Sequence, residues 1–138
     1  MATNQTEAQD ALLALITTTW TANAGGAQLF YDNQGVDRPD SPALFGRAIV
    51  RHGRGTRTTL GVNRFRRFGT VFVQAFVPQG SRRDLAILRD LTDDIAHAIE
   101  EATIAGIRIQ DVDINELGSD GTYFQINVAA QFTYDRQA

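Results

Sequence analysis

The sequence lacks cysteine and lysine altogether, and it has one methionine and three prolines among its 138 residues. Without cysteine the chain can form no disulfide, has no thiol nucleophile and lacks the usual ligands of structural zinc sites. No apolar run approaches the roughly 20 residues that cross a bilayer, and no charged-then-apolar leader opens the chain. We therefore expect a soluble domain without covalent staples, made inside the cell and independent of membranes.

The length and the hydrophobic content of 43% fit one domain spanning residues 1–138. A chain of this size buries most of its apolar surface on folding, so its core needs no disulfide or bound metal to be stable. All 13 basic residues are arginines.

The net charge of −3 conceals a strong segregation along the chain. Residues 1–40 carry five acids and one arginine, residues 41–83 carry nine arginines and no acid, and residues 84–120 carry ten acids and two arginines. Such blocks indicate either a polyanionic partner or a complementary protein surface. Because the acidic block is as large as the basic one, we favour complementarity within or between subunits over nucleic acid.

Hydrophobic periodicity predicts two helices. Thr6 and Gln9 have capping-box spacing and open the first helix, which we expect to end near Trp20 because a run of β-branched threonines precedes it. Ser81 opens the second helix, in which leucine and isoleucine recur at helical spacing as far as Ala102. Between the first helix and the first strand, residues 23–43 are rich in Gly, Asn, Asp and Pro, and they predict a long irregular loop.

Alternating apolar residues predict five strands. They cover residues 44–52, 56–62, 69–77, 107–114 and 124–134. We expect a turn at residues 53–55, a basic connection at 63–67, another turn at 117–121, and a bulge near Asp111, where the apolar phase shifts. The sequence therefore predicts an α+β fold: a single small domain with a mainly antiparallel sheet of about four to five strands and two helices packed on one face.

No constellation of residues in the sequence supports catalysis or metal binding. Neither His52 nor His97 has a second histidine at metal spacing, so we expect both to be satisfied or exposed. Asp111, Asp113 and Asn115 resemble the start of a calcium loop, but the glycine and glutamate that such a loop requires later are absent. Gly-rich phosphate loops and nucleophile elbows are missing as well. We predict that the protein is not an enzyme and has no catalytic residues, metal or cofactor.

The basic segment from Arg64 to Phe68 allows two interpretations. Arginines interleaved with phenylalanines could contact phosphates and stack on bases of nucleic acid. Alternatively, the aromatic residues anchor strand ends while the guanidinium groups pair with carboxylates of another subunit. We favour the second interpretation. The candidate interface residues are Arg54, Arg57, Arg64, Arg66 and Arg67 on the basic side and Asp90, Asp93, Asp94, Glu100 and Glu101 on the acidic side.

Residues 67–80, Arg-Phe-Gly-Thr-Val-Phe-Val-Gln-Ala-Phe-Val-Pro-Gln-Gly, lead directly into the helix at Ser81. This segment resembles the centre of the tail terminator proteins of long-tailed, non-contractile (lambda-like) bacteriophages. The early helix, the segment Phe30-Tyr31-Asp32-Asn33 and the terminal strand ending Gln131-Phe132-Thr133-Tyr134 agree with the resemblance. It extends in element order from about residue 6 to residue 135.

The resemblance implies a structural virion protein rather than an enzyme. Tail terminators form a homo-oligomeric ring, typically of six subunits, on the head-proximal end of the tail tube. The ring stops tube polymerisation and joins the tube to the head-completion or connector proteins, and genomic DNA later passes through its lumen without sequence-specific binding. The protein would be assembled in the host cytoplasm and reside in the virion tail.

Alternative functions are another head–tail joining or tail-completion protein, or a small nucleic-acid-binding domain that uses residues 54–67. A duplex must slide through a ring without sticking, and each phosphate contact adds salt-sensitive affinity. In a ring we therefore expect the arginines to be interfacial or outward and the lumen to be neutral or acidic.

Overall fold

The computed structural model describes residues 4–31, 43–57, 64–79, 82–102, 104, 106–119 and 122–137. Two helices and five strands follow one another in the order α1, β1, β2, β3, α2, β4, β5. Their bounds are α1 Gln5–Asn23, β1 Gln28–Tyr31, β2 Phe45–Arg57, β3 Arg64–Pro78, α2 Arg82–Glu100, β4 Ile107–Ser119 and β5 Tyr123–Gln137.

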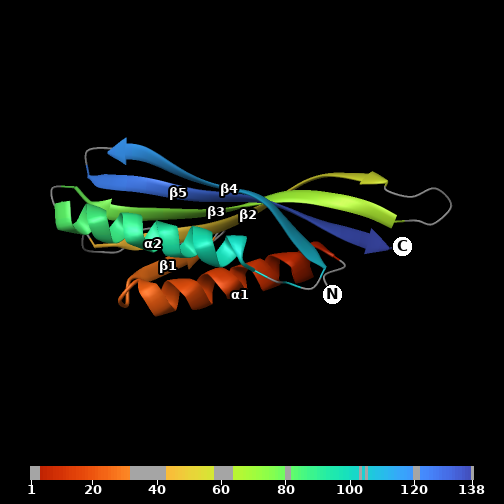
Figure 1. The fold of residues 1–138 in the computed structure, drawn as a ribbon, viewed down its shortest axis with the longest axis horizontal. Helices are drawn as coiled ribbons and strands as arrows, with labels where there is room; N and C mark the ends of the chain where they lie inside the picture. The colour runs from red at the N-terminus through yellow and green to blue at the C-terminus, as the bar shows by residue number, and fades with distance from the viewer. Residues whose placement is uncertain are drawn as a thin grey trace.

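The strands form one sheet in the order β1-β2-β3-β5-β4. β1 runs parallel to β2, and every other neighbouring pair is antiparallel. Both helices lie on the same side of this mixed sheet (Figure 1). The predicted class is confirmed: a single small α+β domain with a mostly antiparallel sheet.

The hydrophobic core lies between the helices and the central strands. The helices contribute buried side chains at helical spacing, chiefly Ala8, Leu12, Ile16 and Trp20 of α1 and Leu88, Leu91, Ile95 and Ile99 of α2. They pack against alternate residues of the central strands, namely Val71, Val73, Ala75 and Val77 of β3 and Ile126, Val128, Ala130 and Phe132 of β5. Strict alternation places these strand residues on one face of the sheet. The prediction that the apolar residues of the last strand share one face is therefore confirmed.

Two boundary predictions in the first third of the chain are wrong. The N-cap of α1 is Asn4 rather than Thr6: its side chain accepts a hydrogen bond of 2.9 Å from the backbone N–H of Glu7 and donates one to the Glu7 carboxylate. Part of the predicted loop 23–43 is strand β1, because a segment of four residues can add to the edge of β2 in parallel. Residues 32–42 of that loop lie outside the described part of the chain.

Three further boundaries differ because strand pairing overrides local turn signals. β2 continues through the predicted turn at 53–55. The glycines lie in a bulge there, at a register shift between His52 and Gly55. The predicted basic connection 63–67 is the beginning of β3 from Arg64 onward, and β4 continues through residues 117–119 of the predicted second turn. The predicted strand 56–62 is confirmed only at residues 56–57, since residues 58–63 are not described. The bulge expected near Asp111 is confirmed by a register shift between Ile109 and Val112.

Candidate functional site: two oppositely charged surfaces

One end of the sheet gathers arginines from four strands. We call it the arginine end and define it as residues 53–57 of β2, 64–68 of β3, 107–108 of β4 and 133–137 of β5. The strand register places these segments beside one another, and Figure 1 shows β2, β3 and β5 continuing there beyond the helices. The segments carry one acid, Asp135, and seven arginines, namely Arg54, Arg57, Arg64, Arg66, Arg67, Arg108 and Arg136.

Two arginines of this end have described side chains that lie against their own chain. Arg66 donates from Nε to Oδ1 of Asp135 at 3.1 Å, and the two side chains are 33% and 20% exposed. Arg67 projects from the opposite face of β3 and lies over Gly55, where an added Cβ would be 2.8 Å from its Nη1 atom. A side chain at position 55 would therefore displace the guanidinium group. The side chains of Arg54, Arg57, Arg64 and Arg136 are outside the described part.

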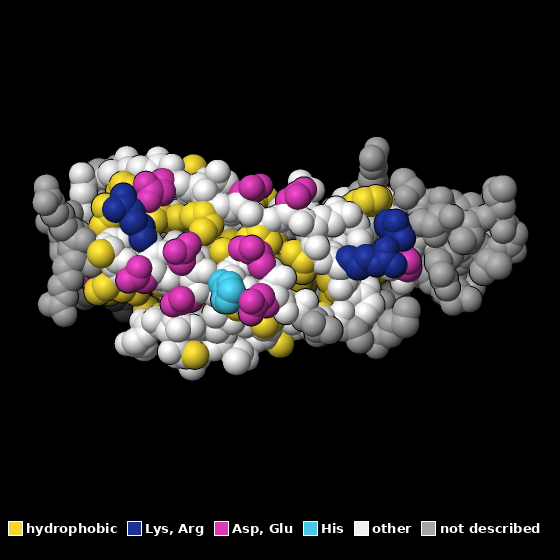
Figure 2. Space-filling view, viewed as in Figure 1, with side chains coloured by type: hydrophobic (Ala, Val, Ile, Leu, Met, Phe, Trp, Pro, Cys, Tyr) yellow, Lys and Arg dark blue, Asp and Glu magenta, His cyan; other side chains and the backbone are white. Residues whose placement is uncertain are grey.

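The outer face of α2 is the second charged surface, which we call the acidic face. It consists of five exposed carboxylates, Asp90, Asp93, Asp94, Glu100 and Glu101. Figure 2 shows acidic side chains spread over this helix and basic side chains toward both ends of the molecule; Arg89 lies on the helix itself and pairs with Glu116. Nε2 of His97 lies 3.3 Å from Oε2 of Glu101, across one helical turn. Among the described residues, no arginine forms an ion pair with any of the five.

A salt bridge ties α2 to the sheet edge. Arg89 donates from Nε to Glu116 of β4 at 2.7 Å and from Nη2 to the second carboxylate oxygen at 3.5 Å. This hydrogen bond lowers the pKa of Glu116 and raises that of Arg89. Both side chains are about half exposed, so solvent screens the pair. The salt bridge therefore joins α2 to β4 but adds little to the free energy of unfolding.

His52 is half-buried between the sheet and α1. Its Nε2 lies 3.4 Å from Oε1 of Gln9, and its ring meets Phe132 edge-on at a centroid distance of 6.2 Å. The other ring nitrogen, Nδ1, is buried and has no hydrogen-bond partner among the described residues. The expectation that both histidines are satisfied or exposed is therefore met by His97, which is exposed, and only in part by His52. Burial lowers the pKa of His52, so this site favours the neutral imidazole.

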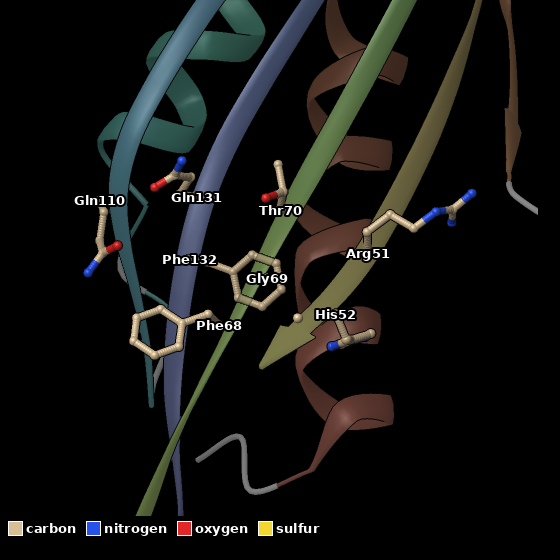
Figure 3. Close-up of a pocket in the computed structure, with 9 residues that line it drawn as sticks. Arg51, His52, Phe68, Gly69, Thr70, Gln110, Gln131 and Phe132 are labelled. Carbon is tan, nitrogen blue, oxygen red and sulfur yellow. The ribbon is translucent and has the colours of Figure 1, made fainter. Parts of the chain in front are cut away.

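A hollow of about 360 Å³ lies next to the arginine end, where His52 of β2, Gly69 of β3 and Phe132 of β5 are neighbours in the sheet (Figure 3). Gly53, Gly69, Phe68 and Phe132 line it, together with amide and hydroxyl groups from three strands, which belong to Thr70, Gln110 and Gln131. In Figure 3 the Arg51 side chain extends away from these groups. Amides and a hydroxyl can hydrogen-bond to a ligand, whereas His52, which also lines the hollow, carries an imidazole that can accept a proton near neutral pH.

The structure brings together the predicted arginines with Arg108 and Arg136, which sequence analysis did not single out. Only the strand register shows that these two arginines lie at the arginine end, because β4 and β5 are far from β3 in the sequence. It does not bring the arginines next to the acidic face of the same chain. No group of three or more His, Asp or Glu side chains suitable for a metal ion occurs within the described ranges. None of the helices there is long and apolar enough to span a membrane.

Comparison with known proteins gives a fold and no function. No family model matches the chain, and no curated protein matches it. One solved structure, which carries no functional name, aligns with a TM-score of 0.58 over 88% of this chain and 94% of its own, at 13% sequence identity. At this identity the likeness shows a shared fold alone.

Proposed function

We propose that this protein is a structural subunit of a phage tail: a tail terminator that forms a closed ring on the head-proximal end of the tail tube. The observation that carries the proposal is the separation of the arginine end from the acidic face on one small domain. The resemblance of residues 67–80 to tail terminators gives the ring its place in the particle.

A head-to-tail ring needs two different and complementary patches on every subunit, whereas a two-fold dimer needs one patch that complements itself. The arginine end carries seven arginines against one aspartate, and it would repel its own copy. The acidic face is equally unsuited to self-pairing. Two such surfaces meet favourably only when the arginine end of one copy contacts the acidic face of the next.

Electron microscopy of the purified chain, alone and mixed with tail tubes, tests the proposal. We expect rings of uniform diameter, and caps at one end of each tube that stop its further growth. Free monomers that leave tube length unchanged would refute it. Reversing Arg64, Arg66 and Arg67 to Glu should abolish both rings and caps, while retained helix and sheet content in circular dichroism would show that the variant is folded.

The basic cluster also favours a second candidate, a surface for nucleic acid. The register adds Arg108 and Arg136 to the arginines of β2 and β3, and Phe65 and Phe68 lie half-buried at the same end. Phosphate contacts make affinity fall steeply with salt. Binding of a short duplex by isolated subunits at moderate salt, with no discrete oligomer, would support this candidate against the ring.

A further inference from the structure

β4 forms a long outer edge of the sheet. β4 has 13 residues and a strand neighbour on one side only, β5. Two register shifts, between Ile109 and Val112 and between Glu116 and Gly118, divide it. Bulges of this kind block continuous strand addition to an edge, so a partner at β4 should contact side chains rather than extend the sheet.

Apolar side chains are exposed along this edge. Ile114 is 42% exposed and Leu117 is 58% exposed, and together with Ile87 of α2 they are the large hydrophobic residues most accessible to solvent in the described part. Ile114 is opposite Val128, which is buried beneath the helices. Ile114 therefore projects on the helix side of the sheet, beside α2, at a point where the helix does not cover it.

The side of α2 next to β4 is identified by the Arg89–Glu116 salt bridge. Asp93 follows Arg89 by four residues and Glu100 follows Asp93 by seven, so all three lie in one row along that side of the helix. Both acids are exposed. Figure 2 shows hydrophobic surface between acidic side chains on the helix and others along the β4 edge. We call Asp93, Glu100, Ile114 and Glu116 the α2–β4 surface.

We propose that the α2–β4 surface receives the arginine end of a second copy of this chain; the inference rests on the ring proposed above. An arginine side chain combines an apolar stem with a planar cation, and so it fits an apolar strip bordered by carboxylates. The arginine end has arginines in four strands by register, and the described side chains among them are those of Arg66 and Arg67 of β3 and Arg108 of β4. Arg89 is already neutralised by Glu116, which leaves Asp93 and Glu100 as the carboxylates that meet the incoming guanidinium groups.

The other side of α2 supplies a matched control. Asp94 and Glu101 have the same residue types at the same spacing of seven and are also exposed. Each follows Asp93 or Glu100 by one residue, which turns it by about 100° around the helix, away from the β4 side. We expect Asp93→Arg with Glu100→Arg to weaken assembly at least tenfold at about 0.1 M salt, where charge pairs are only partly screened. Asp94→Arg with Glu101→Arg makes the same change of charge on the acidic face away from β4, and it should weaken assembly several-fold less than the first pair. Equal effects of both pairs, or assembly of the first variant like the wild type, would overturn the inference and leave the ring proposal standing.

Mixing two defective variants tests the partner directly. In the variant with Asp93→Arg and Glu100→Arg the row of α2 beside β4 is basic, and in the variant with Arg64, Arg66 and Arg67 changed to Glu the β3 segment of the arginine end is acidic. Each alone should fail to assemble, but an equimolar mixture should restore an oligomer in which the two alternate. Misfolded variants cannot be rescued in this way. Failure of the mixture to assemble would overturn the inference, and a wild type that forms no closed oligomer would overturn the ring proposal itself.

Discussion

The helix-covered part of the sheet and the arginine end are built from the same strands but have opposite chemistry. In β3, residues 71–77 alternate buried valine and alanine with half-buried residues, whereas residues 64–68 contain three arginines. The first part is constrained by the helices packed on it. The second part extends beyond the helices. Ile107, Thr133 and Tyr134 are buried there as well, but the side chains of Arg66 and Arg67 are half-buried and that of Arg108 is exposed. The buried residues under the helices maintain the fold, and we assign the arginines of the arginine end to assembly.

The boundary between the two parts is a row across the sheet at Gly69 and Phe132. β2 is bulged just beyond this row, between His52 and Gly55, and β4 is bulged beside it, between Ile109 and Val112. Bulges bend a strand and increase its local twist. Figure 1 shows the strands crossing over one another in this region. The arginine end is therefore turned relative to the helix-covered part.

The largest effect is expected in the helix-covered part. Ile95→Ala removes a fully buried side chain of α2 and should lower the free energy of unfolding by about 2–5 kcal/mol. Ile87→Ala in the same helix removes a side chain that is 43% exposed and should cost less than about 1 kcal/mol. Urea denaturation followed by circular dichroism measures both. Similar losses for the two variants would show that α2 does not pack as described.

The next effect tests the boundary row. A Cβ at position 69 would lie 2.4 Å from the ring of the buried Phe132 and 2.9 Å from the Arg51 carbonyl oxygen. Gly69→Ala should therefore destabilise the fold by about 1–3 kcal/mol through overpacking. Gly53→Ala is the matched control, because its Cβ would meet its nearest neighbour at 3.4 Å. Thermal unfolding of both should give a clearly lower Tm for the first alone, and an unchanged Tm for Gly69→Ala would contradict the close contact.

A smaller effect is expected from pH at His52. Its pKa is lower in the folded protein than the ordinary value of 6.5 because burial penalises the charged ring. The unfolded state then binds more protons, so stability is complete above about pH 6.5 and falls as the pH drops below it, by less than about 1.4 kcal/mol per pH unit. His52→Gln should flatten stability curves measured between pH 5.5 and 7. A dependence that persists in this variant would assign the effect to another group.

The smallest effect concerns the arginine end. Asp135→Asn removes the carboxylate that holds Arg66, and because the pair is partly exposed, stability should fall by only about 0.2–1 kcal/mol. The same change releases a guanidinium group and should strengthen salt-sensitive assembly. Urea denaturation and light scattering would measure the two quantities. A loss above about 2 kcal/mol would mean that this end supports the fold and is not reserved for a partner.

The fold class was predictable because a helix or strand that is buried on one side has apolar residues at a regular spacing in the sequence. The alternation from Phe124 to Tyr134 and the spacing from Leu88 to Ile99 identify a half-buried strand and an amphipathic helix without further information. The bulge near Asp111 was visible for the same reason, as a change of phase. Strand β1 was not predictable, because four residues among turn formers have no period of their own and become a strand only by pairing with β2.

The charged surfaces were predictable only in part. Blocks of like charge along the chain reveal that arginines and acids are segregated, but not which ones meet in space. Arg108 and Arg136 join the arginine end through the register of β4 and β5, which is a non-local property. The glycines at 53 and 55 predicted a turn and the cluster at 63–67 predicted a basic connection, and the long pairing of β2 and β3 overrode both local signals.

Sedimentation velocity of the wild-type chain over a range of salt concentrations tests the central claim most directly. An assembly held by two unlike charged surfaces should sediment at low salt as one discrete closed oligomer, of six subunits if the resemblance to tail terminators holds. It should dissociate to monomers as rising salt screens the contacts. A chain that remains monomeric at every salt concentration, or forms a dimer insensitive to salt, would contradict the account.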